Sequence, residues 1–189
     1  FVSKVGEEAN MPFAVGGGIA KISDIQKIIA AGAEKVIINT QALYVNFIRE
    51  AADTFGSSTI VVCMDVKKKL FGKKQTWTLA GEKASGYDPV DFARMMQDSG
   101  AGEIIVQSIE HDGMMQGYDI PLIKAVSEAV TIPVIALGGA GNLSHLKQAY
   151  TEAYANGLSA GSMFVYHGSR KGILINYPER HEMKELFKL

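Results

Sequence analysis

Glycine and small polar residues form two groups, each where a predicted strand gives way to a turn. The first group is Gly18, Asn39 and Thr40, and the second is Gly113, Gly139, Gly161 and Ser162. A glycine at a strand end has no Cβ, so backbone N–H groups can approach an anion, and the next helix N-terminus adds partial positive charge. We therefore expect two phosphate sites and a ligand with a phosphate at each end. The competing interpretation is that these glycines only serve tight turns.

Asp65 is the only acidic side chain in the apolar run IVVCMDV, residues 60–66. A carboxylate near the end of a buried strand costs free energy unless it is paired or used. Such surroundings raise the pKa of a carboxyl group and suit it to proton transfer. The alternative is an aspartate bonded to a loop N–H. Asp112 lies beside the second glycine group, where it is also explained as the turn residue before Gly113.

Other common catalytic arrangements are not found in the sequence. Neither GGGIAK nor GGAGNL fits the Walker pattern, which argues against a nucleoside triphosphatase. The four histidines and Cys63 lack the spacing of a metal site, and no nucleophile is paired with a base. We expect no cofactor and no metal. The lysine-rich segment 67–86 is interpreted as solvated surface or, above a bisphosphate site, as a mobile lid.

Alternating strands and helices must position these residues. Apolar runs predict strands, helical periodicity with caps predicts helices, and the alternating QTWTL segment predicts an excursion hairpin within 67–86. The expected strands are 12–19, 34–40, 60–66, 103–109, 133–137 and 158–165. The expected helices are the end of one at 1–8, then 23–32, 45–55, 89–99, 121–130, 142–155 and one or two within 169–189.

The same design is repeated along the chain. PFAVGGGI at 12–19 is followed by a strand with the polar end INT, and PVIALGGAG at 133–141 by one with the small end AGS. Because the strands are continuous apolar runs and none has the pattern of an edge strand, we expect a (β/α)-barrel rather than an open doubly wound sheet. The C-terminal ends of barrel strands form one catalytic face.

Composition limits the function classes. With 189 residues, 47% hydrophobic and 21% charged, the chain is expected to form one globular domain over 1–189. A net charge of -1 gives no field suited to nucleic acid or to an acidic membrane, and no apolar run is long enough to span a bilayer. Cys63 is the only cysteine, which favours a reducing, cytoplasmic compartment.

Several motifs together resemble a known family. VGGGI, EKVIINT, GAGEI, DGMMQGYD and IPVIALGGAGN are similar to the cyclase subunit of imidazole glycerol phosphate synthase, over nearly the whole chain. The resemblance implies a lyase with a (β/α)8 TIM barrel fold. In that family a glutaminase partner subunit makes ammonia, which passes through the barrel and reacts with the bisphosphate substrate PRFAR. The products are imidazole glycerol phosphate and AICAR, in histidine biosynthesis.

The resemblance also implies roles for individual residues. Asp65 matches the catalytic aspartate of the fifth strand, a general acid or base. One substrate phosphate site is matched by Gly18, Asn39 and Thr40, and the other by Asp112, Gly113, Gly139, Gly161 and Ser162. Lys35 and Glu103 match a charged ring at the base of the barrel, where ammonia enters.

Departures from the family pattern leave three functions open. The family begins with two further strand-helix units, the first carrying a second catalytic aspartate, and we expect that this N-terminal part is lost from the chain. Inside the second site, Gln107 replaces the usual Thr and Glu110-His111 replaces Asp-Arg. The tail HGSRKGILINYP also differs. These changes resemble a paralogous branch that supplies ammonia for amidation or acetamidino modification of surface sugars. The third possibility is a non-catalytic phosphate-binding barrel.

Overall fold

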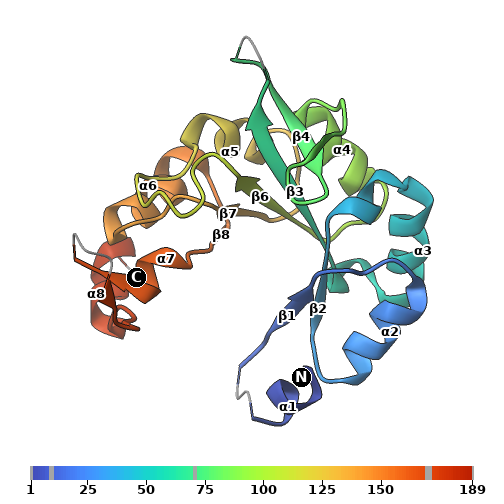
Figure 1. The fold of residues 1–189 in the computed structure, drawn as a ribbon, viewed down its shortest axis with the longest axis horizontal. Helices are drawn as coiled ribbons and strands as arrows, with labels where there is room; N and C mark the ends of the chain where they lie inside the picture. The colour runs from blue at the N-terminus through green and yellow to red at the C-terminus, as the bar shows by residue number, and fades with distance from the viewer. Residues whose placement is uncertain (1, 9–10, 70–71, 169–171, 189) are drawn as a thin grey trace.

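A parallel sheet covered by helices forms the centre of the protein (Figure 1). The computed structural model describes residues 2–8, 11–69, 72–168 and 172–188. The sheet order is β1-β2-β3-β6-β7-β8, and these neighbours are all parallel. The strands are β1 (Ala14–Gly16), β2 (Lys35–Ile38), β3 (Ile60–Lys68), β6 (Glu103–Ser108), β7 (Val134–Leu137) and β8 (Gly157–Leu158). The predicted α/β alternation is confirmed.

Five helices connect these strands and cover the outer side of the curved sheet (Figure 1). Helix ends follow the sequence signals: the Asp88 and Asn142 side chains accept hydrogen bonds from backbone N–H groups of the first turns. The helices are α2 (Ile22–Ala30), α3 (Val45–Phe55), α4 (Pro89–Asp98), α5 (Ile120–Ser127) and α6 (Leu143–Ala153). Shorter elements are α1 (Val2–Glu8), η1 (Thr40–Leu43), η2 (Ser57–Thr59), α7 (Ser162–Val165), β9 (Tyr166–His167), β10 (Gly172–Ile173) and α8 (Arg180–Phe187).

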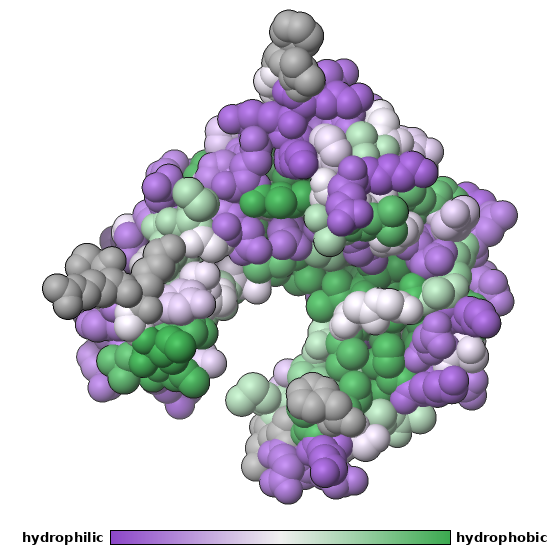
Figure 2. Space-filling model, viewed as in Figure 1, coloured by the Kyte–Doolittle hydropathy of each residue, from purple (hydrophilic) through white to green (hydrophobic). Residues whose placement is uncertain are grey.

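The two faces of the sheet carry different side chains because strand residues alternate in direction. The outer face, including Val62, Met64 and Val106, packs against the helices in the main core. The inner face holds a smaller cluster of Val61, Cys63 and Ile105, with partly buried apolar neighbours from β2 and β7. Apolar surface lines the hollow of the molecule (Figure 2). The inner face therefore has an apolar floor below the polar strand ends.

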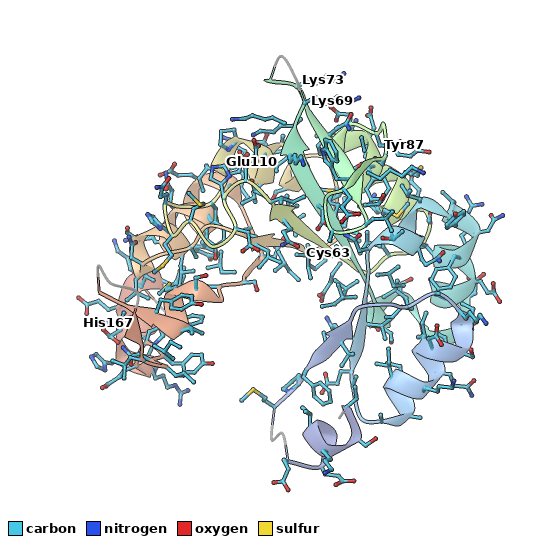
Figure 3. All side chains as sticks on the ribbon, in the orientation of Figure 1. Cys63, Lys69, Lys73, Tyr87, Glu110 and His167 are labelled. Carbon is cyan, nitrogen blue, oxygen red and sulfur yellow. The ribbon has the colours of Figure 1, made fainter. Side chains whose placement is uncertain are left out.

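The predicted excursion hairpin is confirmed. Strand β4 (Lys74–Thr78) pairs antiparallel with β3 and with β5 (Lys83–Ala84), so β3 belongs to both the parallel sheet and the hairpin. Residues 70–71 of this excursion lie outside the described residues. Lys69 and Lys73 lie at its outer tip, far from Cys63 of the inner face (Figure 3).

One predicted strand is wrong. Residues 158–165 were expected to form the last strand, but β8 spans only Gly157–Leu158, and Ser162–Val165 is a helical turn. β8 is short because it pairs with β7 on one side, and in the described residues no second neighbouring strand provides further hydrogen bonds. In the described residues β1 and β8 each pair on one side, which corrects the expectation that no strand is an edge. The described parallel strands therefore form an open, curved half-barrel sheet.

The chain ends lie beside this opening (Figure 1). Helix α8 confirms a predicted C-terminal helix. The described residues exclude residues 169–171 and 189 of the predicted C-terminal region, and residue 1 of the first predicted helix. The segment from Ile173 to Tyr177 is exposed, and after Ile173 it has no regular secondary structure. Among the helices that the structure describes, none has both the length and the apolar character needed to cross a membrane.

Candidate functional site

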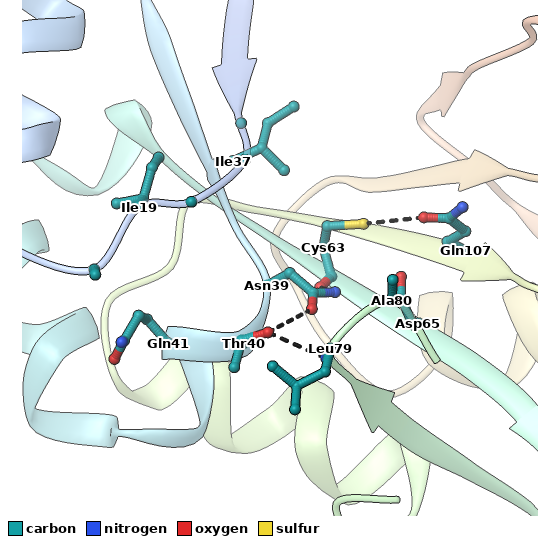
Figure 4. Close-up of a pocket in the computed structure, with 14 residues that line it drawn as sticks. Ile19, Ile37, Asn39, Thr40, Gln41, Cys63, Asp65, Leu79, Ala80 and Gln107 are labelled. Carbon is teal, nitrogen blue, oxygen red and sulfur yellow. Dashed lines mark hydrogen bonds between the residues drawn. The ribbon is translucent and has the colours of Figure 1, made fainter. Parts of the chain in front are cut away.

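Two recesses lie where the parallel strands end at their carboxyl side. The larger pocket, of about 600 Å³, is lined by the predicted residues Gly18, Asn39, Thr40 and Asp65 (Figure 4). The second recess, called here the glycine pocket, is lined by all five residues predicted for the other phosphate site: Asp112, Gly113, Gly139, Gly161 and Ser162. The structure thus sorts the predicted site residues into the same two groups, on the same side of the sheet.

Three hydrogen bonds, two of them with main-chain groups, hold the polar wall of the larger pocket (Figure 4). The Asn39 amide donates to the carbonyl oxygen of Cys63 at 2.9 Å, and the Thr40 hydroxyl donates to Asn39 Oδ1 at 3.3 Å. The same hydroxyl accepts from the Leu79 N–H at 3.3 Å, which ties the return of the hairpin to the pocket. Gly18 has φ of 69°, with open space where a Cβ would stand. Its backbone is accessible to an anion.

Asp65 is buried inside this pocket, with 7% of its surface exposed. It is three residues from the end of β3, not at the strand end as expected, because pairing with β4 extends the strand to Lys68. Burial raises the pKa of the Asp65 carboxyl, the Asn39 side chain opposes that rise, and the negative charge of Asp112 adds to it. A carboxyl group in this environment is suited to exchange a proton with a bound substrate.

The glycine pocket requires glycine for steric reasons. Gly139 has φ of 113°, and a Cβ there would lie 2.1 Å from the carbonyl oxygen of Gly117. The Gly117 N–H donates to the Gly139 carbonyl at 2.8 Å, so two loops contact each other through main chain. The recess is therefore built mostly of backbone and small side chains, as an anion site requires.

Gln107 lies between the two recesses. It stands opposite Asp65 in the parallel β3–β6 register and lines the larger pocket. Its side chain accepts from the Cys63 thiol at 3.7 Å and donates to Asp112 Oδ2 at 3.4 Å. The two recesses are therefore connected through one amide.

Lys35 and Glu103 are at the opposite end of the sheet, at the first residues of β2 and β6. They form an ion pair, with side chains 34% and 19% exposed. Their predicted role as an ammonia gate is not tested by this contact. The pair does place opposite charges together at the end of the sheet away from both pockets.

Sequence reasoning assigned no site role to several residues of the larger pocket. Cys63 belongs to an apolar strand run, and Leu79 and Ala80 enter through the fold of the hairpin. Gln107 was expected inside the second phosphate site, but it lines the larger pocket and reaches the glycine pocket through Asp112. The period of two along β3 places Cys63 on the same face as Asp65, which is a signal that the sequence does contain. The position of Leu79 depends on a tertiary turn that carries no such pattern.

Within the described ranges, no cluster of three or more His, Cys, Asp or Glu side chains has the geometry to hold a metal ion. Comparison with known proteins gives a family. Residues 1–171 match the profile of the family described as "Histidine biosynthesis protein". The chain is also 36% identical over 191 residues to a protein of Vibrio vulnificus (strain YJ016) that carries the provisional name imidazole glycerol phosphate synthase subunit hisF3. That similarity covers 100% of this chain and 73% of the relative.

Proposed function

Because the chain belongs to the histidine biosynthesis protein family and is similar to the cyclase subunit of imidazole glycerol phosphate synthase, we propose that it is the ammonia-dependent lyase that converts PRFAR to imidazole glycerol phosphate and AICAR. The observation that carries the proposal is the position of Asp65, a buried carboxyl group inside one of two glycine-lined recesses on the same side of the sheet.

Each group of residues has a role in this proposal. The Gly18, Asn39 and Thr40 group binds one substrate phosphate, and the glycine pocket binds the other. Backbone N–H groups and small polar side chains suit both tasks. Asp65 holds or accepts a proton at the reacting part of PRFAR between these ends, since its raised pKa keeps the protonated form available closer to neutral pH than in an ordinary aspartate.

We further propose that the sheet is part of an eight-stranded TIM barrel. All six strands are parallel in sequential order, which is the arrangement of such barrels. The outer edges of β1 and β8 are where a barrel of this kind would close.

Turnover of PRFAR with ammonium salts tests the proposed reaction. We expect Asp65→Asn, which keeps the shape but removes the exchangeable proton, to lower kcat by about 10²–10⁴-fold. Asp53→Asn, an exposed aspartate on α3, is the matched control and should keep wild-type activity. Folded wild-type protein that binds PRFAR without converting it would refute the reaction.

We propose that a glutaminase subunit docks at the end of the sheet that carries Lys35 and Glu103. Lys35→Glu places two carboxylates together there and should abolish glutamine-dependent turnover while sparing turnover with ammonium. The double variant Lys35→Glu with Glu103→Lys restores an ion pair and controls for folding. If Lys35→Glu lowers turnover equally with glutamine and with ammonium, Lys35 and Glu103 are not an ammonia gate.

The ammonia-supplying paralogue for surface-sugar modification is the second candidate. It is favoured by the Gln107 side chain, whose amide lies between the two recesses. A ligand that spans both recesses would contact this amide at its middle part. This candidate predicts phosphate binding without conversion of PRFAR. The assay above therefore separates the two functions.

A further inference from the structure

Gln107 makes contacts whose chemistry fixes the direction of its amide group. Burial, and then the charge of Asp65, raise the pKa of the Cys63 thiol to about 12, so Cys63 stays an S–H donor. The amide oxygen of Gln107 accepts from this donor. An ionised carboxylate such as Asp112 only accepts, so the opposite, NH₂ end of the amide must point to it, as observed. Both partners demand the same orientation.

The carboxylate of Asp112 is in an unfavourable position for an anion site. Asp112 lines the glycine pocket beside Gly113 and Gly139, so its carboxylate would repel an anion bound there. Its carboxylate oxygen is, however, bonded toward Gln107, on the side of the larger pocket. The negative charge of Asp112 also acts on the larger pocket, because it contributes to the raised pKa of Asp65. The carboxylate therefore acts on the larger pocket.

We propose that Gln107 is a positioning residue for Asp112, whose amide draws the Asp112 carboxylate toward the larger pocket and thereby leaves the glycine pocket open to an anion. The inference rests on the proposed phosphate site in the glycine pocket. It gives a function to the Gln107 side chain, whose amide contacts Cys63 on the inner face of the sheet and Asp112 at the glycine pocket. Gln107 acts through Asp112, so removing Asp112's charge should remove the need for Gln107.

An NMR titration with inorganic phosphate tests this dependence, followed at the backbone amides of Gly139 and Gly161. Gln107→Met keeps the length of the side chain but cannot donate, and we expect it to weaken phosphate binding at these amides by about tenfold, as for loss of a hydrogen bond to a charged group. In an Asp112→Asn background the same change should alter affinity by less than about twofold. Gln26→Met, at an exposed glutamine on α2 that lines neither pocket, is the matched control and should leave these amides unaffected.

Gln107→Glu provides a second variant of nearly the same shape. At pH 8 its carboxylate repels Asp112, so phosphate binding should weaken more than in Gln107→Met, and less so when Asp112 is Asn. Equal weakening with and without the Asp112 charge would overturn the inference, as would unchanged affinity in both variants or no phosphate response of Gly139 and Gly161 in the wild type. None of these outcomes depends on PRFAR turnover, so failure of the proposed reaction is recognised separately.

Discussion

The ion pair between Lys74 and Asp119 gives a prediction whose size follows from the structure. Lys74 Nζ lies 2.7 Å from Asp119 Oδ1 and 2.6 Å from Oδ2, and it joins the excursion hairpin to the start of α5. The side chains are 26% and 7% exposed. Asp119 also accepts from the Leu122 N–H at 3.1 Å, as the N-cap of that helix. Within the described residues, removing Lys74 therefore leaves Asp119 as a buried carboxylate whose remaining partner is the Leu122 N–H.

Breaking a buried pair from one side costs about 3–5 kcal/mol. Since Lys74 is partly exposed and Asp119 keeps its cap, we expect Lys74→Met to lower the free energy of unfolding by about 2–3 kcal/mol. With a denaturant slope of roughly 2 kcal/mol per M, the urea midpoint should fall by about 1 M. The assay is urea unfolding followed by circular dichroism at pH 7.

The control is an exposed pair on α4. Arg94 and Asp91 are 3.9 Å apart and 57% and 73% exposed, so Arg94→Met should cost less than about 0.5 kcal/mol. A double-mutant cycle of Lys74→Met and Asp119→Asn, which keeps an acceptor for the helix cap, should give a coupling of about 2 kcal/mol. If Lys74→Met and Arg94→Met have the same effect, the argument that burial strengthens this pair is refuted.

Three further outcomes are expected. Gly139→Ala should unfold at a markedly lower urea concentration than wild type, because its Cβ would lie 2.1 Å from the Gly117 carbonyl oxygen and its φ is 113°; an unchanged midpoint would contradict the close approach. Burial raises the pKa of Asp65 above its ordinary value of 3.8, so the stability this group contributes is complete below that value and is lost as pH rises through the folded pKa. Urea unfolding of Asp65→Asn should accordingly show a gain in stability over wild type that is larger at pH 7 than at pH 3.5, and an equal difference at both would rule out the raised pKa. Because the pKa of the Cys63 thiol is raised to about 12 and the side chain is buried, iodoacetamide at pH 8 should alkylate it far more slowly in native protein than in urea-unfolded protein, by mass spectrometry; similar rates would disprove its protection.

Local signals were sufficient for the repeating framework. The run Pro133 to Leu137 followed by glycines and the cap Asn142 specifies a strand, a turn and a helix without distant information, and β7 and α6 form there. The same holds for the glycine pocket, since steric freedom at Gly139 is visible in the residue type itself. Local signals therefore sufficed to predict the residue groups that line the two recesses.

Long-range pairing was not predictable from these patterns. Phe164 and Val165 extend an apolar run and so suggested strand, but a strand forms only where a neighbour provides hydrogen bonds. Pairing with β7 ends at Leu158, before these residues. Likewise, Leu79 reaches the larger pocket because the hairpin folds back along β3, a tertiary event. The contact between the Cys63 thiol and the Gln107 amide also depends on the β3–β6 register, which no single segment encodes.

The predominance of main chain around the glycine pocket has a consequence for how such a protein can diversify. Peptide dipoles carry no titrating proton and no replaceable functional group, so their contribution to anion binding does not change when a side chain is substituted. Side chains between the two recesses, by contrast, can be exchanged one at a time. Related proteins with this arrangement can therefore keep their binding sites for the charged ends of a ligand while the chemical group between those ends changes.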